Sequence, residues 1–318
     1  MTAYIIRRLV QGLIILVIVT VLVFVAMHFL PGDPLVLYMA QHQLNNLPEQ
    51  QLEALRHEFG LDKSIPAQYV HWMYDLLQGD LGTSIYYREK VAKLIGERLP
   101  VTIHLGIIAL LISSILGPTA GVICAVRRGK WLDTLVTMLA NLGITAPRFW
   151  LGIVLIYLFA LKLRWLPVCG YTSPLENFVL STKQIILPVL CLLVGPLASL
   201  ARQTRSSMLE VVRQDYIRTA WSKGLKERVI VIRHALKNGL IPVVTMLGMQ
   251  VSTIFGGAIL IETVFSIPGI GRLMVEAVFG QDYQVVQAGV LVLAVAVMLS
   301  NLVVDLCYGL LDPRIRYS

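Results

Sequence analysis

The sequence is poor in charged residues, which make up 14% of its 318 residues, against roughly 25% in an average soluble domain. Hydrophobic residues make up 56% of the chain, and the mean hydropathy is +0.72. A soluble core cannot use this much apolar surface, whereas a bilayer can. The composition excludes an ordinary soluble domain and predicts an all-α polytopic membrane protein.

Signatures of catalysis and of cofactor binding are also missing. The sequence has no Gly-x-x-x-x-Gly-Lys-Ser/Thr phosphate loop and no His-Glu-x-x-His motif. Its four cysteines lie far apart without metal-ligand spacing, and its six histidines do not cluster. Acidic residues are nearly absent from the centres of the apolar runs, where ion-coupled transporters need them. We expect no enzyme, no cofactor, no metal site and no nucleic-acid partner, in a chain that lacks its own energy source.

Six apolar runs approach the roughly 20 residues that cross a bilayer. The third run is interrupted at Pro147, and the fourth is short and carries two prolines. Pro100 precedes the second run, where a proline suits a first helical turn. The expected spans are Leu9–Leu30, Val101–Val126, Leu132–Leu161, Ile185–Ala201, Gly239–Ile261 and Val285–Val304.

The first apolar run follows Arg7 and Arg8. A signal peptide has an apolar region of about 7–15 residues and a small-residue cleavage site. This run is longer and shows no clear site, and the surroundings of a twin-arginine signal are missing. We therefore expect a retained first helix with a cytoplasmic basic anchor.

Basic residues predict the orientation of the chain. Residues 1–8, 127–131, 202–238 and 312–318 hold 16 of the 27 lysines and arginines. Residues 31–99 hold six basic and nine acidic residues. Because cytoplasmic loops carry the excess of Lys and Arg, we expect both termini and residues 202–238 inside and residues 31–99 outside.

The external segment has helical patterns of its own, at Pro48–Phe59 and at Pro66–Gln78, the second rich in aromatic residues. We divide the chain into residues 1–94, the first transmembrane helix with the external segment, and residues 95–318, the transmembrane domain. Two stripes of small residues favour close helix packing. They are Ser113, Gly117, Gly121 and Ala125 in the second run, and Gly248, Ser252 and Gly256 in the fifth.

The cytoplasmic segment 202–238 is the most informative part of the sequence. It predicts a helix, a break at Gly224 where the backbone can take a positive φ, and a second amphipathic stretch from Glu227 to Lys237. Such an element is a rigid knob that a soluble partner can grip; the alternative is a basic loop that touches lipid headgroups. The candidate contact residues are Asp215, Tyr216, Ile217, Arg218, Thr219, Ala220, Trp221, Gly224 and Leu225.

This segment resembles the "EAA" loop of the permease subunits of bacterial binding-protein-dependent ABC importers. That loop has a Glu-Ala-Ala-x-x-x-Gly core; here Arg218-Thr219-Ala220 stands in its first three places and Gly224 matches the glycine. The Tyr-Ile-Arg-Thr-Ala-x-x-Lys-Gly-Leu form is that of the dipeptide, oligopeptide and nickel branch. Further motifs fit that branch in the expected order. They are Pro31-Gly32-Asp33-Pro34, Gly79-Asp80-Leu81-Gly82-x-Ser84, Trp165-Leu166-Pro167-x-x-Gly170-Tyr171, Arg205-Ser206-Ser207-Met208-Leu209, Pro268-Gly269-x-Gly271 and Asp312-Pro313-Arg314-Ile315-Arg316.

The resemblance implies a type I importer permease with a MetI-like bundle in the bacterial inner membrane. It implies a second homologous permease subunit, two ATP-binding subunits docked on the cytoplasmic loops, and an external solute-binding protein. In that arrangement Ala220 and Gly224 sit in the groove of an ATP-binding subunit. The cargo is a peptide or a related solute such as glutathione or a nickel chelate. The alternatives are a secondary transporter or channel not driven by ATP, and a membrane scaffold or enzyme subunit.

Arg148 follows Pro147 near the middle of the third run. A central arginine costs about 2.5–3.5 kcal/mol on insertion scales, so it normally faces a polar interior or finds a partner. One interpretation is that Arg148 lines the translocation path and meets an anionic group such as a peptide carboxylate. The alternatives are a bond to carbonyls freed by the proline, a pair with an acid such as Glu262, or a side chain that reaches the interface.

The predicted orientation can be tested with single cysteines at Glu53 and at Lys226, after replacement of Cys169. An impermeant thiol reagent on intact cells should label position 53, which we place outside, and spare position 226. Labelling at position 226 but not at position 53 would show that the orientation is the reverse of the predicted one.

Overall fold

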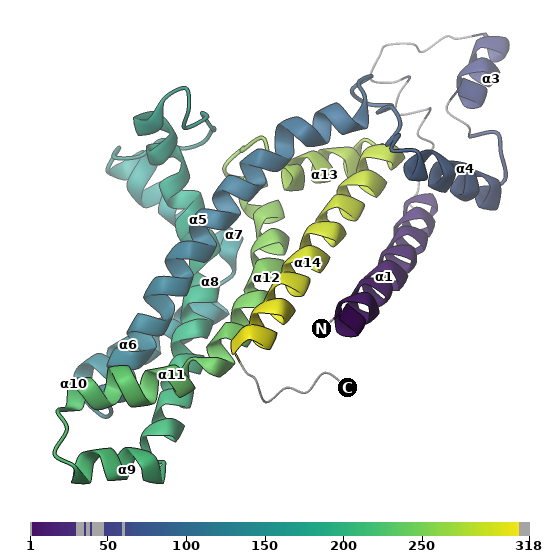
Figure 1. Cartoon of the computed structure of the whole chain (residues 1–318). Helices are drawn as coiled ribbons and strands as arrows, with labels where there is room; N and C mark the ends of the chain where they lie inside the picture. Colours follow the sequence, from purple (N-terminus) through teal and green to yellow (C-terminus); the bar gives the residue numbers. More distant parts are fainter. Residues whose placement is uncertain (1, 30–34, 36–38, 40–47, 59–60, 312–318) are drawn as a thin grey trace. The chain divides into compact units, whose positions relative to one another are not determined.

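The computed structural model describes residues 2–29, 35, 39, 48–58 and 61–311, which are mostly helical (Figure 1). Within this described part, the only extended pairing is an isolated β-bridge between Thr83 and Lys90. The predicted all-α fold is therefore confirmed. The main elements, with π-helical segments written η, are α1 (Thr2–His28), α3 (Glu49–Glu58), α4 (Ile65–Leu77), α5 (Val91–Val126), α6 (Trp131–Thr145), α7 (Arg148–Leu155), η1 (Ile156–Lys162), α8 (Phe178–Val212), α9 (Asp215–Ser222), α10 (Glu227–Val229), η2 (Ile230–Ala235), α11 (Leu236–Gly239), α12 (Ile241–Val264), α13 (Ile270–Phe279) and α14 (Tyr283–Leu311).

Five of the described helices are long and apolar enough to cross a membrane, and the number is six if one bent pair counts as a single span. This agrees with the predicted number of about six. The spans are Ile6–His28, Val91–Val126, Phe178–Val212, Ile241–Val264 and Tyr283–Val303, and the bent pair is Trp131–Thr145 with Arg148–Lys162.

The predicted boundaries of two spans were wrong. Helix α5 begins at Val91, so Pro100 lies inside the helix rather than in its first turn. Helix α8 extends from Phe178 to Val212 and contains Pro188 and Pro196, both buried. A proline removes one backbone hydrogen bond, but tertiary packing can hold the helix through it. The first turns of α5 show this, because Val91, Leu94 and Ile95 are buried in a cluster with Ile270, Leu273 and Ala277 of α13.

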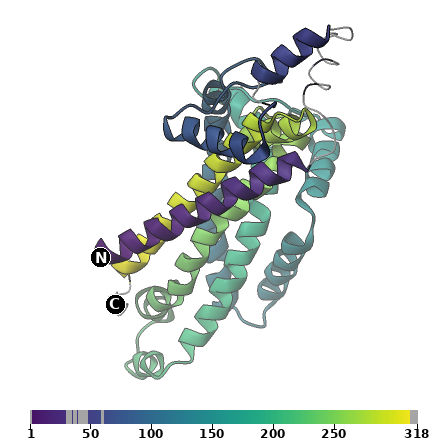
Figure 2. The ribbon, with the colours of Figure 1, turned by 90° about the vertical axis from the view of Figure 1, so that its right-hand side faces the viewer.

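The third predicted span is two helices rather than one. The axes of α6 and of α7–η1 differ by 107°, and the break between them is visible in Figure 2. Ala146 has an extended ψ of 127° and Pro147 precedes the first turn of α7. The residue before a proline is disfavoured in the helical region, so the Ala146-Pro147 pair ends one helix and starts the next.

The chain forms two compact units. The first comprises Met1–Val101 with Pro268–Met298, and the second comprises Thr102–Ile267 with Leu299–Ser318. The sequence-based division at residue 94 stays a prediction. Two motifs of the sequence analysis, residues 31–34 and 312–316, lie outside the described residues.

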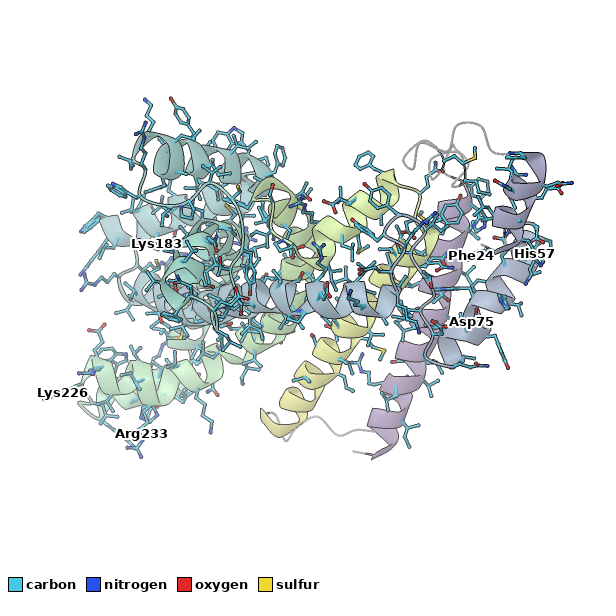
Figure 3. All side chains as sticks on the ribbon, turned by 90° about the horizontal axis from the view of Figure 1, so that it is seen from above. Phe24, His57, Asp75, Lys183, Lys226 and Arg233 are labelled. Carbon is cyan, nitrogen blue, oxygen red and sulfur yellow. The ribbon has the colours of Figure 1, made fainter. Side chains whose placement is uncertain are left out.

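In the first unit, α4 packs against α1 through aromatic rings. The Phe24 ring lies 5.3 Å from that of Tyr69 and 6.2 Å from that of Trp72, between centroids. The His28 Nε2 and Gln68 Oε1 atoms are 3.1 Å apart. Figure 3 labels Phe24 on α1 and Asp75 on α4. The two helices predicted between residues 48 and 78 are confirmed as α3 and α4, and α4 packs on α1.

A buried polar clamp joins the loop before α5 to the start of α14. The Ser84 hydroxyl donates to the Asp282 carboxylate, and the Tyr86 amide donates to the same oxygen at 3.1 Å. The Tyr87 amide donates to Ser84 Oγ at 2.8 Å, and the Tyr87 hydroxyl donates to Glu276 Oε2 at 2.8 Å. Burial and the Glu276 carboxylate raise the pKa of Tyr87 well above its usual range. Ser84 and Asp282 are both buried. The clamp joins two segments of the chain that are 198 residues apart in the sequence.

In the second unit, the small-residue stripe of α5 lies against α8, as predicted. A Cβ at Gly121 would come within 2.5 Å of the Ala201 carbonyl oxygen, and one at Gly117 within 2.8 Å of Leu200 Cβ. The stripe of α12 does not pack throughout in this way. Gly256 is exposed, with no atom near its Cβ position among the described residues, and the closely packed residue is its neighbour Gly257.

The clamp predicts that Ser84→Ala destabilises the protein by about 1–3 kcal/mol, because the Tyr87 amide and the Asp282 carboxylate each lose a buried partner. Thermal unfolding of the purified protein in detergent measures this change. Ser64→Ala is the matched control, because Ser64 precedes α4 and makes no side-chain cap bond. Equal melting temperatures for the two variants would contradict the role of the clamp.

Candidate functional site

The candidate knob consists of α9, the turn at Gly224, and the α10–η2–α11 segment. Asp215 stands in the first turn of α9, where a negative charge suits the helix dipole. The turn that follows α9 needs Gly224, which has a φ of +75°, and its amide donates to the Trp221 carbonyl at 2.9 Å. A Cβ there would meet no described atom, so the requirement for glycine is conformational rather than steric. The predicted helix–glycine–helix element is present.

One face of α9 packs onto its own chain. Ile217 is fully buried and Ala220 is 6% exposed. Both belong to a cluster with Met208 of α8, and Leu225 packs at its edge. The small side chain of Ala220 therefore serves contacts within this subunit. The expected contact of Ala220 with an ATP-binding subunit stays a prediction.

Two aromatic side chains flank this buried face, because Tyr216 lies one turn before Ala220 and Trp221 lies one turn after Ile217. Tyr216 is 43% exposed and Trp221 is 48% exposed. Arg218 and Asp215 form a solvent-exposed ion pair at 3.5 Å, which contributes little to stability. Tyr216 is oriented by the Asn238 amide, whose Nδ2 donates to the Tyr216 hydroxyl at 2.8 Å. The exposed surface of α9 therefore has partly exposed aromatic rings at the edges of the buried face and charges of both signs on the opposite side.

The second half of the knob stiffens the first. Ile230 and Ala235 of η2 are buried in the same cluster as Ile217 and Ala220, so the amphipathic pattern predicted after Gly224 is confirmed. In Figure 1 helix α9 lies beyond the ends of α5 and α6, and Figure 3 labels Lys226 and Arg233, which project from the second half of the knob. The knob is a packed element of the second unit rather than a loose basic loop.

A buried ion pair joins α6 to α8. Arg205 donates to the two oxygens of Asp133 at 2.6 and 2.8 Å, and the Gly129 amide donates to Asp133 Oδ2 at 3.0 Å. Asp133 is 5% exposed. Sequence reasoning missed this pair. The available signal was that Asp133 lies just inside one apolar run and Arg205 just beyond another. Charged side chains near a membrane span tend to pair with one another.

Arg148 lies in the first turn of α7, not in the middle of a continuous span. Its Nη1 donates to the Thr253 carbonyl of α12 at 2.8 Å. Gly257 makes room for the guanidinium, because a Cβ at that position would overlap Nη1, and Gly195 of α8 lies within van der Waals reach. The acceptor belongs to a neighbouring helix rather than to the turn that Pro147 opens.

Two further polar contacts lie within the second unit. Glu262 is fully buried and accepts a hydrogen bond from the Thr102 hydroxyl at 2.6 Å. His104 Nδ1 and the Tyr171 hydroxyl are 2.9 Å apart, and burial raises the pKa of Tyr171. Among the described residues, no group of three or more His, Cys, Asp or Glu side chains gathers as a metal site requires.

Several membrane-crossing helices with one stiff, half-exposed helical knob define a membrane-spanning subunit of a transport system. The chain belongs to the family described as "Binding-protein-dependent transport system inner membrane component", which residues 117–317 match. Residues 1–106 match the corresponding N-terminal family of membrane components.

Relatives of known name cover the whole chain. The "Di/tripeptide transport system permease protein DppB" of Pseudomonas aeruginosa is 42% identical over 340 residues, with 100% of both chains covered. The "Probable peptide ABC transporter permease protein" of Sinorhizobium fredii is 39% identical over 317 residues, again with full coverage of both. A chain of the inward-facing MetNI methionine ABC transporter matches with a TM-score of 0.58 at 18% identity, over 70% of this chain and 97% of that chain. The last match shows the fold alone.

Family membership settles the class of function. The chain is a non-catalytic, multi-pass permease subunit of a binding-protein-dependent ABC importer. The resemblance seen in the EAA-like loop is thereby confirmed. The alternatives of a secondary transporter, a channel or a scaffold are set aside.

Proposed function

We propose that this subunit forms half of the path by which small peptides cross the bacterial inner membrane. Peptide cargo is supported by the printed names of relatives that match along the full length of the chain. A second permease of the same kind would supply the other half of the path, and an external binding protein would deliver the cargo. Two ATP-binding subunits would drive transport from the cytoplasm, the side on which we place both termini and residues 202–238.

The ATP-binding subunits would dock on the exposed surface of α9. The observation that supports this most directly is the division of the helix, with Ile217 and Ala220 packed inward and Tyr216 and Trp221 exposed. A helix braced in this way can move as a body when a partner pushes on it. Exposed tryptophan, tyrosine and arginine are also the residues that dominate the binding energy of protein interfaces. Gly224 and Leu225 would hold the turn behind this surface.

We predict that Trp221→Ala abolishes most ATP hydrolysis stimulated by the loaded binding protein, and most peptide uptake, in reconstituted proteoliposomes. Loss of a central tryptophan costs an interface about 2 kcal/mol or more, roughly a thirtyfold weaker contact. The variant should reach the membrane at normal levels, because the Trp221 side chain is 48% exposed and is not among the residues of the buried cluster around Ile217 and Ala220. Trp165→Ala is the matched control, since Trp165 is also exposed but lies in the loop after η1.

The inward face should respond differently. Ala220→Asp buries an unpaired charge, at a cost of several kcal/mol, and Gly224→Val strains a left-handed turn. Both variants should lose coupling together with protease resistance of residues 202–238, whereas Trp221→Ala should lose coupling alone. Normal stimulated hydrolysis in Trp221→Ala would show that the exposed surface of α9 has no part in coupling.

Arg148 is proposed to meet the carboxylate of a passing peptide. The single hydrogen bond to Thr253 uses one of the five N–H donors of the guanidinium, and the remaining donors have no acceptor among the described residues. A guanidinium is suited to a carboxylate because it can donate two parallel hydrogen bonds.

Arg148→Gln should therefore lower uptake of a free tripeptide more than uptake of the same peptide with an amidated C-terminus. Rates of ATP-dependent uptake into proteoliposomes measure both, with stimulated ATP hydrolysis as the check on coupling. Arg164→Gln, in the loop after η1, is the matched control. An equal fall for the two peptides would mean that Arg148 only joins α7 to α12.

A further inference from the structure

Helix α6 carries a stripe of polar side chains although it forms half of the bent membrane-crossing pair. The stripe follows helical spacing along one side of the helix. Leu135 and Leu139 lie on a different side and are exposed, as lipid-facing residues are. The stripe consists of Asp133, Thr134, Thr137, Asn141 and Thr145.

This stripe lines a groove with a volume of about 510 Å³. Arg205 of α8 lies at the end near Asp133, and Met138 and Leu142 contribute apolar side chains to the wall. Small-molecule sites typically occupy about 300–1,000 Å³ and combine an apolar lining with a few polar groups. The groove therefore has the size of a site for a peptide of two or three residues.

Two polar groups in the groove lack a partner. The Asn141 amide and the Thr134 hydroxyl make no side-chain hydrogen bond with any residue that the structure describes, and both residues are exposed. Thr145, in contrast, donates to the carbonyl of Asn141 in its own helix at 3.0 Å. Asn141 lies toward the end of α6, within the bent pair of helices that counts as one candidate span. A polar side chain within a span normally faces a protein interior or a water-filled pathway rather than lipid.

The charges in the groove cancel. Asp133 and Arg205 bind each other through two hydrogen bonds, so neither is left to attract an ion. What remains is an amide and a hydroxyl, each of which can donate and accept a hydrogen bond. A peptide bond has the same pair of groups, one N–H donor and one C=O acceptor.

We propose that this groove is the part of the translocation path that binds the peptide backbone, with Asn141 and Thr134 as its hydrogen-bonding groups. The inference rests on the proposed peptide cargo and names the surface that the cargo contacts. Because the contact is made to the backbone, it accepts peptides of differing side chains.

The test uses the complete transporter in proteoliposomes, with trialanine and backbone N-methylated trialanine as the two cargoes. Asn141→Leu should lower trialanine uptake about three- to tenfold, the range expected for one lost hydrogen bond. Trialanine methylated at its peptide nitrogens keeps its carbonyl acceptors but cannot donate a peptide N–H to Asn141 Oδ1. Asn141→Leu should therefore lower its uptake clearly less than it lowers the uptake of trialanine. Effects of methylation on the binding protein cancel, because each cargo is compared between variant and unaltered transporter.

Thr134→Val repeats the test with a substitution of equal volume, and Thr119→Val is its matched control. Thr119 is an exposed threonine of α5 whose hydroxyl donates to its own helix at 2.6 Å. We expect Thr134→Val to lower trialanine uptake and Thr119→Val to leave it unchanged, with equal membrane levels and equal stimulated ATP hydrolysis.

Several outcomes would overturn the inference. Unchanged trialanine uptake in Asn141→Leu and Thr134→Val would exclude a cargo contact. An equal fall for both cargoes, together with weaker assembly, would mean that Asn141 binds the second permease instead. If the unaltered transporter carries no peptide at all, the proposed cargo is wrong and this inference falls with it. If the transporter carries peptide but substitutions at residues 134 and 141 do not change its uptake, only this inference is overturned and the proposed peptide cargo stands.

Discussion

The hydrocarbon core of a bilayer supplies no hydrogen bonds, and this constraint shapes the whole chain. Each backbone amide within the membrane must be satisfied inside its own segment, so the spans are helices. Each polar side chain at depth must find a partner or face water. The structure meets the second requirement in separate places, with the Asp133–Arg205 ion pair between α6 and α8 and the Arg148 bond to the Thr253 carbonyl of α12. These contacts fix helix neighbours that apolar packing alone would leave interchangeable.

Sequence predicted the features that depend on composition and on local chemistry. The length of each apolar run gave the number of spans, and the position of Gly224 gave the turn of the knob, because only glycine adopts a φ of +75° without strain. Helix ends were predicted less well. Pro100 is a reasonable first-turn residue by local rules, yet α5 begins at Val91 because its first turns bury apolar side chains against α13. Such a gain depends on a segment more than 170 residues away and leaves no local signal.

The helix of the knob was predicted from sequence, but which of its residues pack against the rest of the subunit was not. The pattern placed an amphipathic helix at residues 215–222, and the resemblance suggested that Ala220 touches a partner. Which face of a short helix turns inward depends on what lies beneath it, and here that is Met208 together with Ile230 and Ala235. Asp133 and Arg205 show the same limit. Each is readable as an unusual charge at the edge of an apolar run, but the pairing follows only from the packing of α6 on α8.

Helix α8 connects the features that matter for function within the second unit. Its end carries Met208, on which the knob packs, and one turn earlier it carries Arg205, which binds Asp133 of α6. The knob and the polar groove of α6 thus contact the same end of one helix, whose continuity through Pro188 and Pro196 keeps it a single body. Displacing α9 without displacing Arg205 would require the cluster around Met208 to come apart, and interiors packed at this density resist that. The ion pair therefore joins the groove of α6 to the end of α8 that carries the knob, and its charges connect two helices rather than form a site for ions.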